Sequence, residues 1–331
     1  MSQSDHNHHG AGHGHVHGTI DPTILSSQRG IWAVKWSLVV MLLTAVIQLA
    51  IVGLTGSVAL LADTIHNFGD AATAIPLWIA FNLGQRPPSK RFTYGYGRME
   101  DLAGLAVVGV ILFSAAVAGY EAISRLLNPS EITNLWALAA AAIIGFLGNE
   151  GVALFRMRVG REIGSAALVA DGYHARADGL TSLAVLLGVV GVALGFPLAD
   201  PLVGLLITVA ILKIAWDSGK IVLTRLLDGV DPDVVDEIRH ALNHAPGVKE
   251  VSDVRVRWLG HRMHAEVNLA VDPTVSVEEG HDIALEAQHE LLHHLDYLSS
   301  ATIHVDPTSA SGEDHHRVAE HQHGDLSVHA H

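Results

Sequence analysis

The sequence predicts a membrane-embedded bundle of six α-helices, followed by a small α+β domain with the ferredoxin-like element order αββαβ. Only 16% of its 331 residues are charged, whereas 49% are hydrophobic. No charge occurs in the 27 positions from Trp36 to Ala62, and further uncharged runs occupy 102–120, 132–149 and 179–199. Each bilayer-spanning helix needs about 20 such residues. This pattern excludes a small soluble enzyme, a disordered chain and a nucleic-acid binder.

The helical part, residues 31–228, is expected to cross the membrane six times. The predicted spans are 31–54, 57–82, 101–124, 134–156, 163–194 and 199–224. Basic residues gather in the second and fourth connections and after the sixth span: Arg86, Lys90, Arg91 and Arg98; Arg156, Arg158 and Arg161; Lys220 and Arg225. The third connection has only Arg125. Because basic loops stay on the cytoplasmic side, we expect a multi-pass protein of the inner cell membrane with both termini in the cytoplasm.

The periodicity changes after Asp228 to that of a small globular domain, assigned to residues 229–308. Asp231, Pro232 and Asp233 open a short amphipathic helix that runs to about Ala245. Alternating apolar residues and turn signals then predict a strand pair, a longer helix and a last strand: Val248–Trp258, Arg262–Val271, Val275–His294 and Ala301–Val305. This order predicts a compact two-layer domain.

Histidines are abundant and cysteine is absent. Of 23 histidines, six lie within residues 1–30 and six more within the tail at 309–331. Both segments have the composition of disordered tracts that bind metal loosely, or of solvated linkers. Residues 1–230 carry a net charge of −1 and residues 231–331 a net charge of −13. The acidic half attracts cations and repels nucleic acid, and any metal site must use nitrogen and oxygen ligands.

Charged residues inside the second and fifth spans form an internal repeat. Asp63, His66 and Asp70 recur 108 positions later as Asp171, His174 and Asp178, within stretches of fourteen residues that share six identities. A charge at the centre of a span costs about 2.5–3.5 kcal/mol on insertion scales. The same unfavourable residues occur in the same pattern in both spans, so they are candidates for function.

The spacing of this repeat predicts a metal site. Helical residues four apart lie on one face, so His66 projects with Asp70, and His174 with Asp178. If the two helices pack together, two imidazoles and two carboxylates converge in a tetrahedral set suited to Zn2+, with Co2+, Ni2+, Cd2+ and Fe2+ as alternatives. The other interpretation is a pair of polar clusters that only stabilise the bundle interior.

These features resemble the cation diffusion facilitator family of proton-coupled divalent-metal transporters. The resemblance rests on the six spans, the paired histidine–aspartate motifs and the αββαβ domain, and covers about residues 30–308. It implies a homodimer in membrane lipid that exports metal from the cytoplasm in exchange for protons. It also implies that His66, Asp70, His174 and Asp178 form the transport site. We expect the imidazoles to carry protons, because they titrate near neutral pH.

Further roles are expected for residues near this site. Asp63 and Asp171 lie one turn before each histidine and either orient it or line the access path. Glu150 is either a proton relay or a residue at the wet end of the fourth span. By resemblance, Arg98 pairs with an acid at the foot of the sixth span, here Asp228, and closes the dimer contact.

The resemblance also bears on two further metal sites. Tyr96 stands where the family often has a loop histidine, so that loop site is expected to be absent. In the C-terminal domain, His281, His304 and Asp306 match an interfacial metal site, whereas Ser252 and Asn268 replace two histidines. His261 and His264 lie nearby as alternative ligands. The competing interpretation is a set of ordinary surface histidines.

Parts of the sequence also fit two other functions. His289, Glu290 and His293 match the H-E-x-x-H pattern of zinc proteases, but they lie near a helix end with no evident third-ligand motif downstream. A membrane-embedded metal sensor would also use an acidic domain and histidine tails. A site at mid-membrane favours an ion that crosses, so we expect a transporter and not an enzyme.

Overall fold

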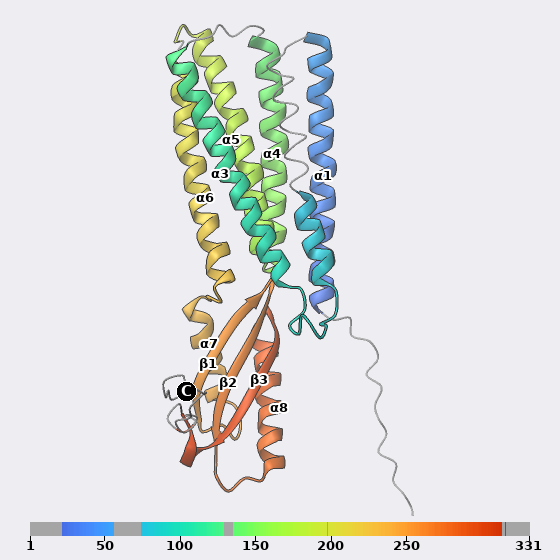
Figure 1. Ribbon diagram of the computed structural model, residues 1–331, viewed down its shortest axis with the longest axis vertical. Coiled ribbons are helices and arrows are strands. Elements are labelled where there is room, and N and C mark those ends of the chain that lie inside the picture. The colour runs from blue at the N-terminus through green and yellow to red at the C-terminus, as the bar shows by residue number, and fades with distance from the viewer. Residues whose placement is uncertain (1–21, 56–73, 129–134, 197, 313–314, 316–331) are drawn as a thin grey trace, which may run out of the picture.

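The computed structural model describes residues 22–55, 74–128, 135–196, 198–312 and 315. Within them, long helices form an upright bundle, and a three-stranded sheet with two helices lies at one end of it (Figure 1). The sequence-predicted order αββαβ is confirmed in this smaller domain. Of the tail predicted at residues 1–30, residues 22–30 instead form the start of the first helix and the rest lie outside the described residues; of the tail at 309–331, only 309–312 and 315 are described.

Five helices of the described part are long and apolar enough to cross a bilayer. They are α1 (Pro22–Thr55), α3 (Arg98–Leu127), α4 (Leu135–Ile163), α5 (Ala166–Ala193) and α6 (Ala199–Leu226). A short apolar helix, Ala74–Gly84, occupies the end of the predicted second span, whose residues 57–73 lie outside the described residues. Five predicted spans therefore coincide with helices, and the remaining one, the second, is described in part.

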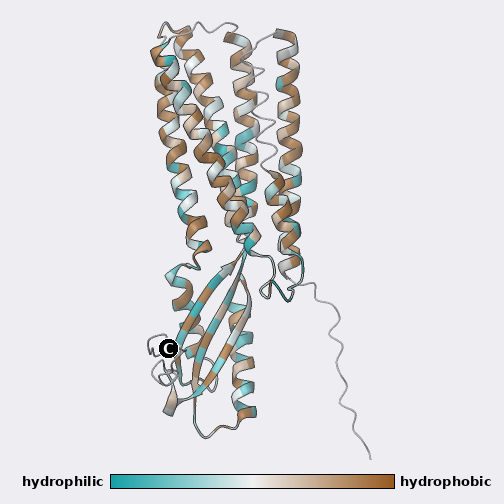
Figure 2. Ribbon diagram, viewed as in Figure 1, coloured by the Kyte–Doolittle hydropathy of each residue, from teal (hydrophilic) through white to brown (hydrophobic). Residues whose placement is uncertain are grey.

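The outer surface of the bundle is apolar (Figure 2). Phe113 on α3 is 69% exposed, and Leu206 and Trp216 on α6 are 69% and 74% exposed. A water-soluble protein rarely exposes contiguous apolar patches of this kind. The surface fits the hydrocarbon core of a membrane, so the protein is a multi-pass membrane protein.

Helix α4 corrects one sequence-based expectation. Arg156, Arg158 and Arg161 were assigned to the fourth connection, but all three lie within α4, which continues to Ile163. The Arg156 side chain is fully buried, and its Nη1 lies 2.9 Å from Oδ2 of Asp171, which is also fully buried. Since a carboxylate on α5 compensates its charge, Arg156 can remain inside the bundle.

A second ion pair and two glycines also join α4 to α5. Arg176 on α5 lies 2.5 Å (Nη2) and 3.2 Å (Nε) from the carboxylate of Glu150 on α4. Closer to the C-terminal domain, Gly160 and Gly172 allow the two backbones to approach. A Cβ on Gly172 would lie 3.0 Å from the Met157 nitrogen and 3.1 Å from the Ala153 oxygen. Small residues at such crossings are typical of membrane helices.

The C-terminal domain is one sheet with two helices packed against it. The strands β1 (Glu250–Leu259), β2 (Arg262–Val271) and β3 (Leu298–Pro307) lie in the order β1-β2-β3. β1 and β2 are antiparallel, whereas β2 and β3 are parallel. Helices α7 (Pro232–Asn243) and α8 (Val277–His294) bury Ile238, Leu242 and Leu291 against the sheet. The short 3-10 helix η1 (Thr308–Ala310) follows β3.

The two parts are joined at the ends of α3 and α6. Asp228, directly after α6, has a positive φ of 62°, which turns the chain toward α7. Arg98 at the start of α3 donates to the carbonyl oxygens of Arg225 and Leu226 and to the Asp228 carboxylate. The predicted pairing of Arg98 with Asp228 is therefore present, and it is a contact within one chain. It supplies donors to the last carbonyls of α6.

We predict that Gly172→Ala loosens the α4–α5 contact. The added methyl overlaps backbone atoms that cannot rotate away, and overpacking of this kind destabilises by about 1–3 kcal/mol. Thermal unfolding in detergent should show a melting temperature several degrees lower. Gly151→Ala on the exposed face of α4, where nothing lies within 4 Å of the new atom, is the matched control. Equal melting temperatures for both variants would contradict this packing.

We predict that Arg156→Met is strongly destabilising, because it leaves the buried Asp171 carboxylate without its counter-charge. Breaking a buried pair in this way costs about 3–5 kcal/mol. Adding Asp171→Leu should recover most of the loss. Glu162→Gln, which breaks an exposed pair with Arg29, should cost at most about 1 kcal/mol. Thermal or denaturant unfolding measures all three variants, and a single Arg156→Met variant as stable as the parent would refute the pairing.

Candidate metal transport site

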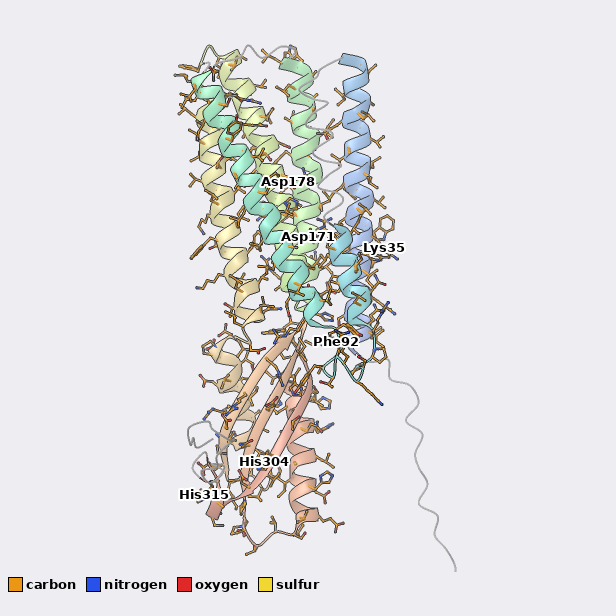
Figure 3. All side chains as sticks on the ribbon, in the orientation of Figure 1. Lys35, Phe92, Asp171, Asp178, His304 and His315 are labelled. Atoms are coloured by element: carbon orange, nitrogen blue, oxygen red, sulfur yellow. The ribbon has the colours of Figure 1, made fainter. Side chains whose placement is uncertain are left out.

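The polar residues predicted from the sequence share one buried face of α5. Asp171, His174 and Asp178 are spaced three and four apart, so they lie in a row along the helix. His174 is completely buried and Asp178 is 3% exposed. Nδ1 of His174 lies 3.6 Å from Oδ2 of Asp178. Figure 3 places Asp171 and Asp178 inside the bundle, away from the C-terminal domain. An imidazole and a carboxylate thus lie side by side within the membrane domain.

The other half of the predicted site cannot be placed. His66, Asp70 and Asp63 all fall in residues 56–73, outside the described residues. In the described part of the chain, no three histidine, aspartate or glutamate side chains are grouped closely enough to hold a metal ion. His174 and Asp178 are two of the four residues predicted to form the tetrahedral site.

Asp171 is held by α4. Its carboxylate is paired with Arg156, whose Nη2 also lies 3.4 Å from Sδ of Met41 on α1. The guanidinium therefore contacts side chains from two neighbouring helices. The sequence does not reveal this partner, because Arg156 reads as a loop residue there and Asp171 is expected only to orient His174 or line the access path. One feature of the sequence could have pointed to this partner. Asp171 is a carboxylate inside the fifth span with no cation assigned to it.

The Glu150 carboxylate forms an ion pair with Arg176. Their side chains are 28% and 30% exposed, and two nitrogens of the guanidinium contact the carboxylate. A proton relay through Glu150 would require this pair to open. The sequence contained both charges, but it did not indicate that they face each other from adjacent helices.

His261 lies at the junction of the two parts. It occupies the turn between β1 and β2, where its Nδ1 lies 2.7 Å from Oε2 of Glu100 and its Nε2 lies 2.8 Å from Oγ of Ser26. Glu100 is 4% exposed and also accepts a hydrogen bond from Ser165. His261 therefore links the C-terminal domain to α1, α3 and the start of α5.

A metal site is predicted in the C-terminal domain, but its residues are not grouped within one protomer. They are His261, His281, His304 and Asp306. His304 pairs in register with Asn268, seven residues from His261, which corresponds to about 23 Å along a strand. His304 Nε2 lies 3.0 Å from Asp306 Oδ1 on β3, and His281 is an exposed residue of α8. The sequence grouped His261 with these residues because it could not reveal the contact with Glu100.

His264, the other alternative ligand, faces a different set of groups. Its Nδ1 lies 2.6 Å from Oγ of Ser300. Burial and the nearby Arg257 guanidinium lower the pKa of His264. Its imidazole is therefore favoured in the neutral form, which is the form that binds metal.

The protease-like motif lies on the surface of α8. His289 and His293 are exposed, with ring centroids 4.3 Å apart. Glu290 lies 3.7 Å from Nδ1 of His294. In the described part of the chain, no third ligand joins these histidines.

Both parts of the chain match models of known protein families. Residues 34–227 match the family model described as "Cation efflux transmembrane domain", and residues 230–308 match "Cation efflux protein, cytoplasmic domain". The "Probable cation efflux system protein Rv2025c" of Mycobacterium tuberculosis is 57% identical over 289 residues, 87% of each chain. The "Manganese efflux system protein MneP" of Bacillus subtilis is 28% identical over 77% of this chain and 89% of that relative.

Among solved structures, a cadmium form of the "MamM CTD" covers 23% of this chain and 95% of that one, with 28% identity and a TM-score of 0.23. The matches to the family models and to the mycobacterial relative cover most of the chain. The chain therefore belongs to the cation diffusion facilitator family and is a divalent metal cation efflux protein.

Proposed function

We propose that this protein exports Zn2+ from the cytoplasm in exchange for protons, through a site formed by His66, Asp70, His174 and Asp178. The observation that carries this proposal is the buried pair of His174 and Asp178 on α5. It is supported by the internal repeat, which supplies the same two residue types on the second span. Two half-sites with one imidazole and one carboxylate each make a complete tetrahedral set.

Proton exchange follows from the ligand chemistry. A histidine or aspartate binds a metal ion only when deprotonated, so entry of the ion releases protons and protonation weakens the site. A proton gradient directed into the cytoplasm then favours release of the ion on the other side. The imidazoles of His66 and His174 are the proposed proton carriers, because histidine titrates near neutral pH.

Zinc is the proposed substrate because the site pairs imidazole with carboxylate ligands. This set also accepts Co2+, Ni2+, Cd2+ and Fe2+. A relative at 28% identity carries manganese efflux in its name, so manganese belongs in any test. Oxygen-only sites suit manganese better than sites with two imidazoles, and zinc should therefore be preferred.

The proposal includes a homodimer in the inner membrane with both termini in the cytoplasm. The match of residues 230–308 to a family cytoplasmic domain supports this orientation. His304 and Asp306, already 3.0 Å apart, would supply ligands for an additional metal ion in that domain, together with His281.

We predict that Asp178→Asn and His174→Ala each abolish zinc transport while the protein stays folded. Each substitution removes one ligand of four, and the remaining ligands hold the ion too weakly. Zinc uptake into proteoliposomes made with the full chain measures the effect. Glu162→Gln on the exposed end of α4 is the matched control and should transport normally. Normal transport by the Asp178→Asn protein would refute the proposed site.

We predict that zinc uptake moves protons in the opposite direction and that zinc exceeds manganese in rate. A pH-sensitive dye inside the vesicles reports the protons, with Co2+, Ni2+, Cd2+, Fe2+ and Mn2+ compared in parallel.

Glu290→Gln should leave transport unchanged, whereas a protease would lose its base. Zinc binding without flux or proton movement would favour a sensor and contradict the transporter.

A further inference from the structure

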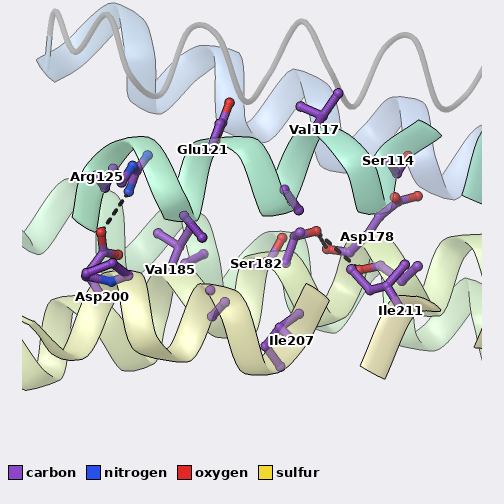
Figure 4. A pocket seen from close by; sticks show the side chains of 18 of the residues that line it. Ser114, Val117, Glu121, Arg125, Asp178, Ser182, Val185, Asp200, Ile207 and Ile211 are labelled. Carbon is purple, nitrogen blue, oxygen red and sulfur yellow. Dashed lines mark hydrogen bonds and ion pairs between the residues drawn. The ribbon is translucent and has the colours of Figure 1, made fainter. Parts of the chain in front are cut away.

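A cavity begins at Asp178 and extends toward the end of the bundle remote from the C-terminal domain. It lies among α3, α4, α5 and α6, and its volume is about 380 Å³. Figure 4 shows Asp178 at one end and Arg125 with Asp200 at the other. The cavity has room for several water molecules. It is large enough for a cation that keeps part of its hydration shell.

An ion pair lies at the remote end of the cavity. Nη1 of Arg125, in the last turn of α3, lies 3.0 Å from Oδ2 of Asp200, in the first turn of α6. The Asp200 side chain is 13% exposed and that of Arg125 is 44% exposed. Asp200 is thus the inner partner and Arg125 the outer one. The positive end of the α6 dipole further stabilises the Asp200 carboxylate.

The position of Asp200 depends on a glycine of α5. Gly188 lies directly against Asp200, and a side chain at position 188 would overlap the Asp200 carboxylate. The carboxylate is therefore held between α3 and α5 instead of extending into lipid. Between the two ends, the wall combines apolar side chains of α6, Ile207 and Ile211, with polar ones from α3 and α5, among them Glu121 and Ser182.

These observations give the two charges opposite effects on a passing cation. Asp200 attracts it, whereas Arg125 repels it and competes for the same carboxylate. A divalent ion carries twice the charge of the guanidinium, so it can displace Arg125 from Asp200. The guanidinium is tethered beside Asp200 and remains at high effective concentration, so it then displaces the ion in turn.

We propose that this cavity is the route by which the metal ion leaves Asp178, with Asp200 as the carboxylate that receives it at the mouth. Arg125 returns to Asp200 after the ion has passed and prevents re-entry. This inference rests on the proposed function, because it takes Asp178 as a ligand of the transported ion. It adds a release-side residue pair that sets the direction and rate of export.

The route is tested first by chemical accessibility, for which the absence of cysteine from the chain is an advantage. Ala118→Cys places one thiol on the cavity wall. Val209→Cys places one on the outer face of α6, where the native residue is 65% exposed. A charged, membrane-impermeant methanethiosulfonate is added on the face opposite the C-terminal domain. The Ala118→Cys protein should react at least about tenfold faster, and zinc should slow that reaction.

The same experiment in an Asp178→Asn background separates this inference from the proposed function. We expect the Ala118→Cys thiol to react as before but without protection by zinc. No reaction at position 118 would overturn the route even if Asp178→Asn still abolishes transport. Full transport by the Asp178→Asn protein would overturn the proposed function, and with it a route that starts at Asp178.

The ion pair is tested by charge removal in proteoliposomes. Asp200→Asn leaves Arg125 uncompensated and should lower zinc flux about tenfold or more with little change in KM. Arg125→Gln should lower flux less than Asp200→Asn does, because release from Asp200 slows, and should make it sensitive to zinc on the release side at about tenfold lower concentration. The double variant should regain flux relative to Asp200→Asn alone.

The matched control for these variants is the Lys213–Asp217 pair, which is on α6 but does not line the cavity. Lys213→Gln and Asp217→Asn should change neither flux nor inhibition by release-side zinc. Equal loss of flux in both single variants and in the double variant would indicate a structural brace and overturn the gating role. Wild-type flux and wild-type inhibition in both single variants would overturn it as well.

Discussion

The membrane domain depends on one constraint, which is that a charge inside a bilayer must have a partner. Helix α5 carries Asp171 and Arg176 through the membrane, and α4 supplies the opposite charge for each. Arg156 pairs with Asp171 at full burial, and Glu150 pairs with Arg176 farther along. Unpaired, each charge would carry a large desolvation penalty. The two pairs therefore fix both the rotation of α5 and its position along α4.

This fixed rotation also determines where the site residues lie. With Asp171 turned toward α4, His174 and Asp178 follow on the same buried face, since they are three and seven residues farther along. The close approach at Gly160 and Gly172 keeps the two helices in contact nearer the C-terminal domain. A site built on such a helix is held by packing on either side of it, which suits a ligand set with a definite geometry.

Helices α3 and α6 connect the C-terminal domain to the opposite end of the bundle. At one end, Arg98 on α3 holds the last carbonyls of α6 and Asp228, while Glu100 contacts His261 of the sheet. At the other end, the same two helices carry Arg125 and Asp200. They pack against each other between these points. Two continuous, packed helices thus join the junction to the mouth of the cavity.

Much of this arrangement could be predicted from the sequence. Hydropathy located the spans, and turn residues with alternating apolar positions gave the order αββαβ. The repeat of His66 and Asp70 as His174 and Asp178 predicts the proposed site, and the shared buried face of His174 and Asp178 follows from their spacing along a helix.

Contacts between distant segments could not be predicted in the same way. A basic residue near a span end reads as a loop residue unless its partner is known, so Arg156 was misplaced. For the same reason, His261 was assigned to a metal site of the sheet, although it contacts Glu100. The Arg125–Asp200 pair has no local signal at all, since 75 residues separate its members.

The central claim is that His174 and Asp178 bind the transported ion. It is tested most directly by a structure of the full-length protein with bound zinc, in which anomalous scattering at the zinc edge locates the metal. We predict a zinc peak in the membrane domain about 2.0–2.2 Å from an imidazole nitrogen of His174 and a carboxylate oxygen of Asp178. Zinc bound elsewhere in the protein, with no peak beside α5 at saturating metal, would contradict it.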